Sequence, residues 1–403
     1  MRGGAARRRE KADGLRALTL PALDFGAVRY TETTVGERGG SAMVPVSETI
    51  PRFPNETVPV MTEADLLRLT PAGLYCERGG FFIDPWSSVA KAVITHAHAD
   101  HARRGSKEYL TTHSGKPVLQ SRMGPGATIQ SVAYGERVLM GDVTVSLHPA
   151  GHILGSAQVR IEHRGEVWVV SGDYKVAPDH LVDAFELVPC HTFITESTFG
   201  LPIYRWRPQA ELYAEINAWW RENQAEGRTS VIHGYSLGKA QRILAGLDRE
   251  IGPIYCHASV AQCNRDYEAG GVRLEGWRML SEAPPRCDWS RAIIVSPPQA
   301  HGSDAPRRYG ETSTAFCSGW MTVRGTRRRE SIDRGFPLSD HADWPELTET
   351  IRATGAERVY VTHGSTATLV RWLIEQGVDA RPLATRFGDE EPTAEPDAAT
   401  TVG

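Results

Sequence analysis

Long hydrophobic runs are absent from this 403-residue sequence. No stretch stays apolar for the roughly 20 residues that a membrane-spanning helix needs, so the sequence predicts a soluble protein that is not associated with a membrane. The first residues, MRGGAARRREKADG, are basic but contain no apolar segment of the kind that a secretory signal requires. We therefore expect a cytoplasmic location.

Paired cysteine motifs are also missing. The six cysteines are scattered without CxxC spacing, which argues against a disulfide framework and against a cysteine-ligated zinc site. A strong excess of one charge is missing as well, because the formal net charge is only −4. This excludes a histone-like polycation but permits a local basic groove for a polyanion.

The chain is longer than one simple core usually requires, so we expect two packed units or one domain that carries a large insertion. Residues 1–60 and 388–403 show no sustained periodicity and have the composition of disordered segments, the second of them acidic. Met61 begins the first segment with a folded pattern and is a candidate native start.

The folded part changes character along its length. Short strand-like runs dominate between residues 73 and 197. The middle alternates helical spacing, at 209–224 and 238–250, with strand-like runs such as TSVIHG and RAIIVSP. Residues 339–364 indicate a helix followed by a strand. This alternation predicts a mixed α/β fold.

Metal-capable side chains follow several of these runs directly. Asp84 ends FFID, His96 follows AVIT, Asp173 ends VVSGD and His363 follows VYVT. Strand ends in α/β proteins gather active-site residues, because the sheet fixes the backbone while the loop exposes the side chains. We therefore expect these residues to converge.

The densest group is HAHADH at residues 96–101, where imidazole and carboxylate side chains suit zinc or a similar divalent ion. A single histidine is usually an ordinary surface or core residue, but the whole HxHxDH cluster favours a metal site. His152 in PAGHILGSA and Asp173 in SGDY follow it in order.

Taken in sequence, Asp84, HAHADH, His152 and Asp173 resemble the first four motifs of the metallo-β-lactamase superfamily. The resemblance implies an α/β fold in which an αββα sandwich holds a two-metal centre. It leaves the substrate open, since members hydrolyse lactams, thioesters, lactones and phosphodiesters.

Further motifs resemble the β-CASP branch of that superfamily, whose members are nucleases acting on DNA or RNA. They are ITESTFG (194–200), YSLGKAQRIL (235–244), FPLSDHAD (336–343) and VYVTHG (359–364). Within the branch, PAGLYC, IDPW, SGWMTVRGTRRR and LSDHADW are most similar to the bacterial ligase-associated DNA exonucleases. The resemblance covers about residues 62–386. It implies a metallo-β-lactamase domain in two parts, 61–200 and 334–387, that flank an α/β β-CASP insertion at 201–333.

The resemblance also implies a role for each matched residue in a centre of two divalent metal ions. The ligands of one ion would be His96, His98 and His152, those of the other would be Asp100, His101 and His363, and Asp173 would bridge them. Zinc is the expected metal, and manganese is an alternative because carboxylates share the site.

Three matched residues would support or complete the catalysis. Asp84 would orient ligand residues of the HAHADH loop. Glu196 would orient His341, and His341 would stabilise charge at the scissile phosphate or donate a proton to the leaving oxygen.

Phosphate contacts are predicted elsewhere in the chain. Lys239 and Arg242 follow YSLG at the start of the expected helix, where free backbone N–H groups favour an anion. Arg324, Arg327 and Arg328 form a denser basic run that would track a nucleic-acid backbone. A solvated surface is the alternative for both sets.

These patterns predict a metal-dependent DNA exonuclease that hydrolyses phosphodiester bonds and acts in DNA repair, in association with a DNA ligase and helicase. The nearest alternative is an RNA-processing β-CASP ribonuclease, because the catalytic motifs do not read the sugar. A small-molecule ester or lactone hydrolase is disfavoured by the three extra motifs and the insertion. A non-catalytic nucleic-acid-binding scaffold is disfavoured by the intact set of ligands.

Overall fold

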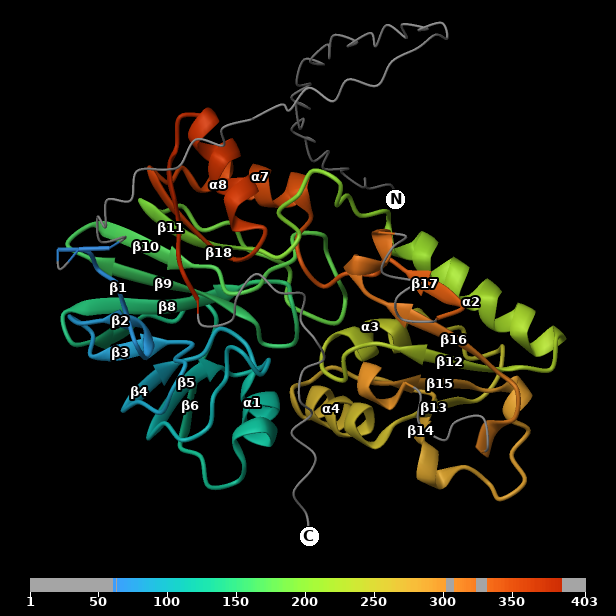
Figure 1. Cartoon of the computed structure of the whole chain (residues 1–403). Helices are drawn as coiled ribbons and strands as arrows, with labels where there is room; N and C mark the ends of the chain where they lie inside the picture. The colour runs from blue at the N-terminus through green and yellow to red at the C-terminus, as the bar shows by residue number, and fades with distance from the viewer. Residues whose placement is uncertain (1–60, 63, 302–307, 324–331, 386–403) are drawn as a thin grey trace, which may run out of the picture. The chain divides into compact units, whose positions relative to one another are not determined.

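The structure is a computed structural model of the chain, and it describes residues 61–62, 64–301, 308–323 and 332–385 (Figure 1). The segments predicted to be disordered, 1–60 and 388–403, lie outside these residues. The basic run with Arg324, Arg327 and Arg328 lies outside them too. The strands of the described part form three sheets.

The first sheet has six strands in the order β1-β2-β3-β4-β5-β6. Their bounds are β1 Arg68–Thr70, β2 Gly73–Cys76, β3 Phe81–Ile83, β4 Lys91–Val93, β5 Glu108–Thr112 and β6 Ile129–Val132. The strands β1 to β3 pair antiparallel, and those from β3 to β6 pair parallel. The strand-like stretch at 73–84 forms a hairpin, with Gly79 and Gly80 in the turn between β2 and β3.

The second sheet has seven strands in the order β19-β18-β11-β10-β9-β8-β7. Their bounds are β7 Val138–Met140, β8 Val143–Pro149, β9 Ala157–His163, β10 Glu166–Val170, β11 Thr192–Ser197, β18 Arg358–Gly364 and β19 Asp379–Pro382. The interior strands β11 and β18 pair in parallel although they are far apart in the sequence. The chain therefore leaves this sheet after β11 and returns to it at β18.

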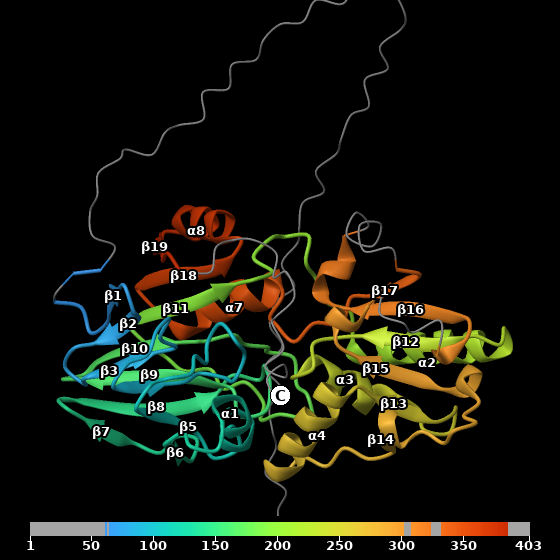
Figure 2. The ribbon, with the colours of Figure 1, turned by 60° about the horizontal axis from the view of Figure 1, so that its bottom comes forward.

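These two sheets pack face to face and are covered by helices on their outer faces (Figure 2). The core between them combines residues such as Phe81 and Val93 from the first sheet with Val159 and Trp168 from the second. Helix α1 (Lys116–Met123) packs on the outer face of the first sheet. Helices α7 (Trp344–Thr354) and α8 (Thr366–Glu375) pack on the outer face of the second. The layers α, β, β and α confirm the predicted sandwich fold.

The third sheet is parallel and has the order β14-β13-β15-β12-β16-β17. Its strands are β12 Thr229–His233, β13 Ile254–Cys256, β14 Trp277–Met279, β15 Ile293–Ser296, β16 Thr312–Cys317 and β17 Arg334–Phe336. Helices α2 (Gln209–Ala225), α3 (Lys239–Gly246) and α4 (Ala258–Ala269) share a core with one face of it. This confirms the α/β alternation expected in the middle of the chain.

All strands of the third sheet lie between β11 and β18 in the sequence, which is the place of the predicted insertion. Strand β17 extends this sheet to Phe336, three residues beyond the boundary predicted at residue 333. The domain boundaries stay predictions. No helix within the described ranges combines the length and apolar content needed to cross a bilayer.

Candidate metal centre and active site

The predicted metal ligands lie at strand ends of the first two sheets. HAHADH follows β4, His152 lies in the loop between β8 and β9, and Asp173 follows β10. Asp84 directly follows β3, and His363 lies near the end of β18. The two sheets position the backbone at each of these points, so that side chains from distant segments meet at one edge of the sandwich.

Four of the predicted ligands form a compact buried group. Each offers one ligand atom, and these atoms lie within 4.8 Å of one another in the group His96, His98, His152 and Asp173. None of the four residues is more than 8% exposed. Histidine nitrogens and a carboxylate oxygen at such distances could hold a divalent ion.

Hydrogen bonds to backbone carbonyls determine which nitrogen of two histidines faces this group. His98 Nε2 lies 3.1 Å from the carbonyl oxygen of Leu237, and His152 Nδ1 lies 2.8 Å from that of Asp340. A carbonyl oxygen only accepts, so these two nitrogens donate. The other two, His98 Nδ1 and His152 Nε2, face each other at 3.0 Å. In the neutral rings both carry lone pairs, which repel at this distance unless a cation lies between them.

A side-chain hydroxyl, in place of a backbone carbonyl, orients His96. Its Nδ1 lies 3.1 Å from Oγ1 of Thr95, and that hydroxyl donates to Oδ2 of Asp84 over 2.5 Å. Its Nε2 is buried, has no hydrogen-bond partner among the described residues, and lies 3.5 Å from Oδ2 of Asp173. A buried polar atom without a partner costs free energy unless a ligand satisfies it. This nitrogen therefore also fits a metal ion.

The charge state of these histidines agrees with metal binding. Burial lowers the pKa of His96 well below its ordinary value, and the neighbouring His101 lowers it further. Burial likewise lowers the pKa of His152 well below the ordinary value, with His341 adding to the effect. Both imidazoles are neutral near pH 7, which is the form that binds a metal.

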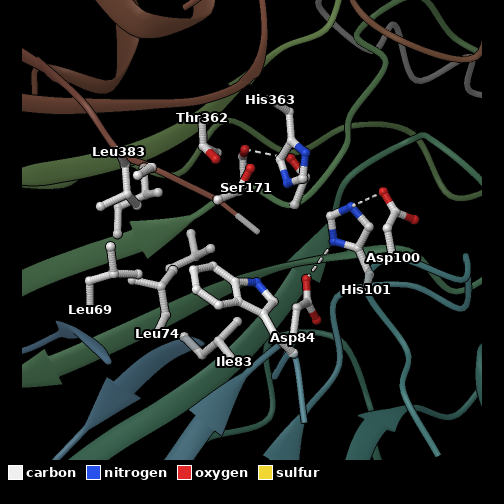
Figure 3. A pocket seen from close by; sticks show the side chains of 16 residues that line it. Leu69, Leu74, Ile83, Asp84, Asp100, His101, Ser171, Thr362, His363 and Leu383 are labelled. Atoms are coloured by element: carbon white, nitrogen blue, oxygen red, sulfur yellow. Dashed lines mark hydrogen bonds and ion pairs between the residues drawn. The ribbon is translucent and has the colours of Figure 1, made fainter. Parts of the chain in front are cut away.

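The second predicted ligand set is centred on His101 (Figure 3). Its Nδ1 donates to Oδ2 of Asp84 over 2.7 Å. Its Nε2 is buried without a hydrogen bond to any described residue and lies 3.4 Å from Oδ2 of Asp100 and 3.6 Å from Oδ2 of Asp173. The ring of His363 lies beside it, with the two centroids 5.2 Å apart.

This second set is less closely gathered than the first. Within the described ranges, Asp100 and His363 do not belong to any group of three ligand atoms that all lie within 4.8 Å of one another. Burial lowers the pKa of His101, but the charges of Asp100 and Asp173 outweigh it and raise that pKa well above its ordinary value. A cluster of carboxylates that attracts a proton here would attract a divalent cation for the same electrostatic reason.

One residue of the second set, His363, and its neighbour Asp84 have strained backbone. Asp84 has a φ of 42° and His363 a φ of 53°, in the left-handed region that is costly for residues other than glycine. Such strain collects at functional sites, where the surrounding structure holds a side chain in a required direction. The cavity in Figure 3 has Asp84 and His363 in its wall, with Leu69, Leu74 and Leu383 forming part of its apolar side.

His341 and Glu196 form a pair next to the four-residue group. His341 Nδ1 lies 3.1 Å and 3.0 Å from the two carboxylate oxygens of Glu196, and the ring of His341 lies 4.6 Å from that of His152. Glu196 is 1% exposed and also accepts a hydrogen bond from the backbone N–H of Tyr174. Burial lowers the pKa of His341, but the charge and hydrogen bond of Glu196 outweigh it and raise that pKa to about 9. His341 is thus positively charged near pH 7.

The two basic residues predicted at the start of α3 do not reach the surface. Lys239 and Arg242 are 2% and 1% exposed. Lys239 forms a salt bridge with Asp340, and Arg242 Nε lies 2.6 Å from Oδ2 of Asp179. Their position corrects the prediction that they contact phosphate, because a buried and paired charge does not present itself to a nucleic acid. The predicted contacts at Arg324, Arg327 and Arg328 lie outside the described residues.

Sequence reasoning missed several groups that hold the histidines in place. Thr95 immediately precedes HAHADH, and a hydroxyl at that position is a signal that could have been used. Asp340 lies inside the SDHAD motif and was not singled out. The carbonyl oxygen of Leu237 leaves no trace in the sequence, because every residue has one.

Comparisons with known proteins give relatives of two kinds. The chain is 31% identical over 311 residues to a "Probable DNA ligase" of Opitutus terrae, a match that covers 76% of this chain and 30% of that protein. It is 30% identical over 223 residues to "Endoribonuclease ysh-1" of Neurospora crassa, covering 44% of this chain and 26% of that protein. It is 28% identical over 218 residues to "Cleavage and polyadenylation specificity factor 73" of Drosophila melanogaster, covering 50% of this chain and 31% of that protein.

The chain thus spans less than a third of the length of these curated relatives. No protein-family model matches it. Among solved structures, a protein of unknown function from Enterococcus faecalis V583 aligns with a TM-score of 0.49 and 13% identity, over 73% of this chain and 79% of that one. On its motifs, its αββα sandwich and the two kinds of relatives, the chain belongs to the β-CASP branch of the metallo-β-lactamase superfamily.

Proposed function

We propose that the chain is a metal-dependent nuclease that hydrolyses phosphodiester bonds in DNA as an exonuclease. One observation carries the proposal. A buried group of histidines and a carboxylate, with ring nitrogens facing one another or left without a partner, lies next to the charged His341. A metal site beside a proton donor is what hydrolysis of an anionic ester requires.

The residues of the first set would hold one divalent ion, and those of the second set would hold another, with Asp173 between them. Such ions would neutralise charge on the phosphodiester and lower the pKa of water in the site. Zinc is the proposed metal because three of the four ligands in the compact group are histidines, and manganese is the alternative.

The chain's own groups supply the remaining chemistry. His341 is charged near pH 7 and its Nε2 is the ring nitrogen that does not face Glu196, so it can donate a proton to the leaving sugar oxygen. Glu196 keeps this ring charged and fixes its orientation. Asp84 accepts hydrogen bonds from Thr95 and His101, and thereby holds both ends of the HAHADH loop.

The choice of DNA rests on the relative named "Probable DNA ligase", which matches more of this chain than the other two do. In that relative, a region similar to this chain is part of a longer protein named as a ligase. We therefore propose that this chain acts in DNA repair in association with a DNA ligase, and with a helicase. The relatives named as endoribonucleases support the second candidate, an RNA-processing ribonuclease. The cytoplasmic location stays a prediction.

The test uses DNA and RNA strands of one sequence, each labelled at its 5′ or its 3′ end, with added Zn²⁺ or Mn²⁺ and with a chelator. We expect stepwise shortening of the DNA that the chelator abolishes, and a loss of kcat of about 10²–10⁴-fold in His341→Ala. The matched control is His163→Ala, since His163 lies at the end of β9 remote from the His152 loop. Cleavage of RNA alone would favour the second candidate, and cleavage of neither strand would overturn the proposal.

A further inference from the structure

The segment Leu237–Arg242, at the start of α3, contacts three loops. They are the HAHADH loop, the loop of His152, and the loop of the proposed proton donor His341. This segment belongs to the part of the chain that builds the third sheet, whereas those histidines belong to the sandwich and to the SDHAD motif. Its first contact is the carbonyl oxygen of Leu237, which accepts the hydrogen bond from His98 Nε2. That bond leaves Nδ1 of His98 to face the ligand group.

Lys239 holds the loop of His341. Its Nζ donates to the carbonyl oxygen of Leu338 over 3.0 Å and to Oδ1 of Asp340. Asp340 directly precedes His341, and its own carbonyl oxygen accepts the hydrogen bond that sets the orientation of His152. The salt bridge from Lys239 therefore fixes Asp340, which is the residue before His341 in the chain and is hydrogen-bonded to His152.

Arg242 holds the loop of His152. Its Nη2 donates to the carbonyl oxygen of Gly151 over 3.2 Å, and its Nη1 lies 3.8 Å from Oδ2 of Asp340. Gly238, which begins the helix, has a φ of +89°, and a Cβ atom there would lie 2.4 Å from Cγ2 of Ile153. The segment is thus packed directly against the residues on both sides of His152.

The charges of this segment are balanced inside the protein. Lys239 and Arg242 face Asp340 and Asp179, and the side chains of all four are 5% exposed or less. Removing one charge of such a set leaves an unbalanced net charge buried in the protein. The two basic side chains therefore neutralise buried carboxylates, a role that the sequence pattern did not indicate.

We infer that Lys239 and Asp340 are positioning residues, which together with Leu237 and Arg242 hold His98, His152 and His341 in the arrangement needed for metal binding and proton donation. The inference rests on the proposed function for its link to hydrolysis. Its effect on metal binding can be measured without any nuclease activity. Groups that orient metal ligands typically change metal affinity or activity by about 10–100-fold when they are removed.

The test compares Lys239→Met with the wild type and with Lys116→Met, a control at an exposed lysine of α1. Calorimetric titration with Zn²⁺ or Mn²⁺ gives the metal affinity, and turnover of labelled DNA at several salt concentrations gives kcat, KM and the salt dependence. We expect Lys239→Met to bind metal about 10–100-fold more weakly and to lose kcat, with KM and its salt dependence unchanged. Lys116→Met should match the wild type in every measurement.

A phosphate-contacting lysine would behave in the opposite way. It would leave metal affinity and kcat unchanged, raise KM, and reduce the slope of log affinity against log salt by about one. That result would overturn the inference. If the wild type cleaves no nucleic acid, the proposed function fails, but the metal titration still tests the inference. Weaker metal binding by Lys239→Met than by the wild type would support it, and equal binding would overturn it.

A second variant separates positioning from misfolding. Lys239→Met combined with Asp340→Asn removes both charges of the pair, so that neither is left buried alone, and its melting temperature should lie closer to the wild type than that of the single variant. We expect its metal affinity and kcat to remain lowered, because the bond that fixes the loop is still missing. Wild-type metal affinity in this double variant would contradict the positioning role.

Discussion

Replacing Arg242 by methionine should destabilise the protein by about 3–5 kcal/mol, because it leaves Asp179 buried without its charged partner. The Arg242 Nε to Asp179 Oδ2 distance is 2.6 Å, and the two side chains are 1% and 0% exposed. Asp179 would keep only the weaker hydrogen bonds from the backbone N–H of Leu181 and from Gln209. Neither replaces the lost charge.

The matched control has the same distance at a different burial. Arg221 Nη2 also lies 2.6 Å from a carboxylate oxygen, that of Asp248, but these side chains are 56% and 37% exposed. Solvent screens such a pair, so Arg221→Met should cost less than about 1 kcal/mol. The comparison isolates burial as the source of the difference between the two variants.

Urea unfolding of the purified variants measures both costs, with the transition slope checked for constancy. The double variant Arg242→Met with Asp179→Asn should lose less than the sum of its two single changes, by about 1–3 kcal/mol. A loss below about 1 kcal/mol for Arg242→Met, or strict additivity in the double variant, would refute the reasoning that burial makes this pair important.

The same pair has a defined pH dependence. Burial raises the pKa of Asp179, but Arg242 and several hydrogen bonds outweigh it and hold that pKa below the ordinary value of 3.8. A depressed carboxyl pKa contributes stability above the unfolded value and loses it as the pH falls through the folded value. The advantage of the wild type over Arg242→Met should therefore shrink in acid, below about pH 4.

Three further predictions concern other parts of the chain. Burial, with a smaller effect of His301, lowers the pKa of His233 from 6.5 to about 4. As the pH falls from 7 to 4, the unfolded state therefore takes up a proton before the folded state does, and the free energy of unfolding decreases by at most about 3 kcal/mol. His233→Asn should flatten this decrease, and an unchanged pH profile of unfolding would argue against the prediction. Glu196→Gln should lower kcat about 10–100-fold. It should also move the alkaline limb of the pH–rate profile to lower pH, because it removes the carboxylate that raises the pKa of His341. An alkaline limb at the same pH as in the wild type would contradict this prediction. Chelation should lower the melting temperature, since metal present at 1,000 times its Kd stabilises the folded protein by about 4 kcal/mol; equal melting with and without chelator would count against a metal bound at His152.

The sequence motifs predicted His96 and His98 because the relevant information is local, whereas His152 and Asp173 were predicted from the order in which they follow that motif. HAHADH places three histidines and an aspartate in one loop after a strand, and the structure brings His96 and His98 together with His152 and Asp173. His341 was found through family resemblance, since no spacing rule connects it to that loop, whereas His363 was also singled out by its place directly after an apolar run. Their catalytic and ligand roles stay predictions.

The basic residues were misread because a sequence shows a charge but not its partner. Asp340 lies 101 positions after Lys239, and Asp179 lies 63 positions before Arg242. A lysine and an arginine at a helix start look the same whether they face a phosphate or a buried carboxylate. Only the packing of α3 against the loops of the sandwich separates the two cases.

The pairing of β11 with β18 has a consequence for synthesis on the ribosome. Glu196 on β11 and its partner His341 are separated by 145 positions, and β18 follows later still. At about 5–20 residues per second, the ribosome needs roughly 7–30 s to make the intervening chain. During this interval β11, whose six residues are all buried in the finished protein, is an open edge without its neighbour. During synthesis, the exposed edge of the second sheet at β11 can therefore pair with other chains, and this period ends only when β18 pairs with it.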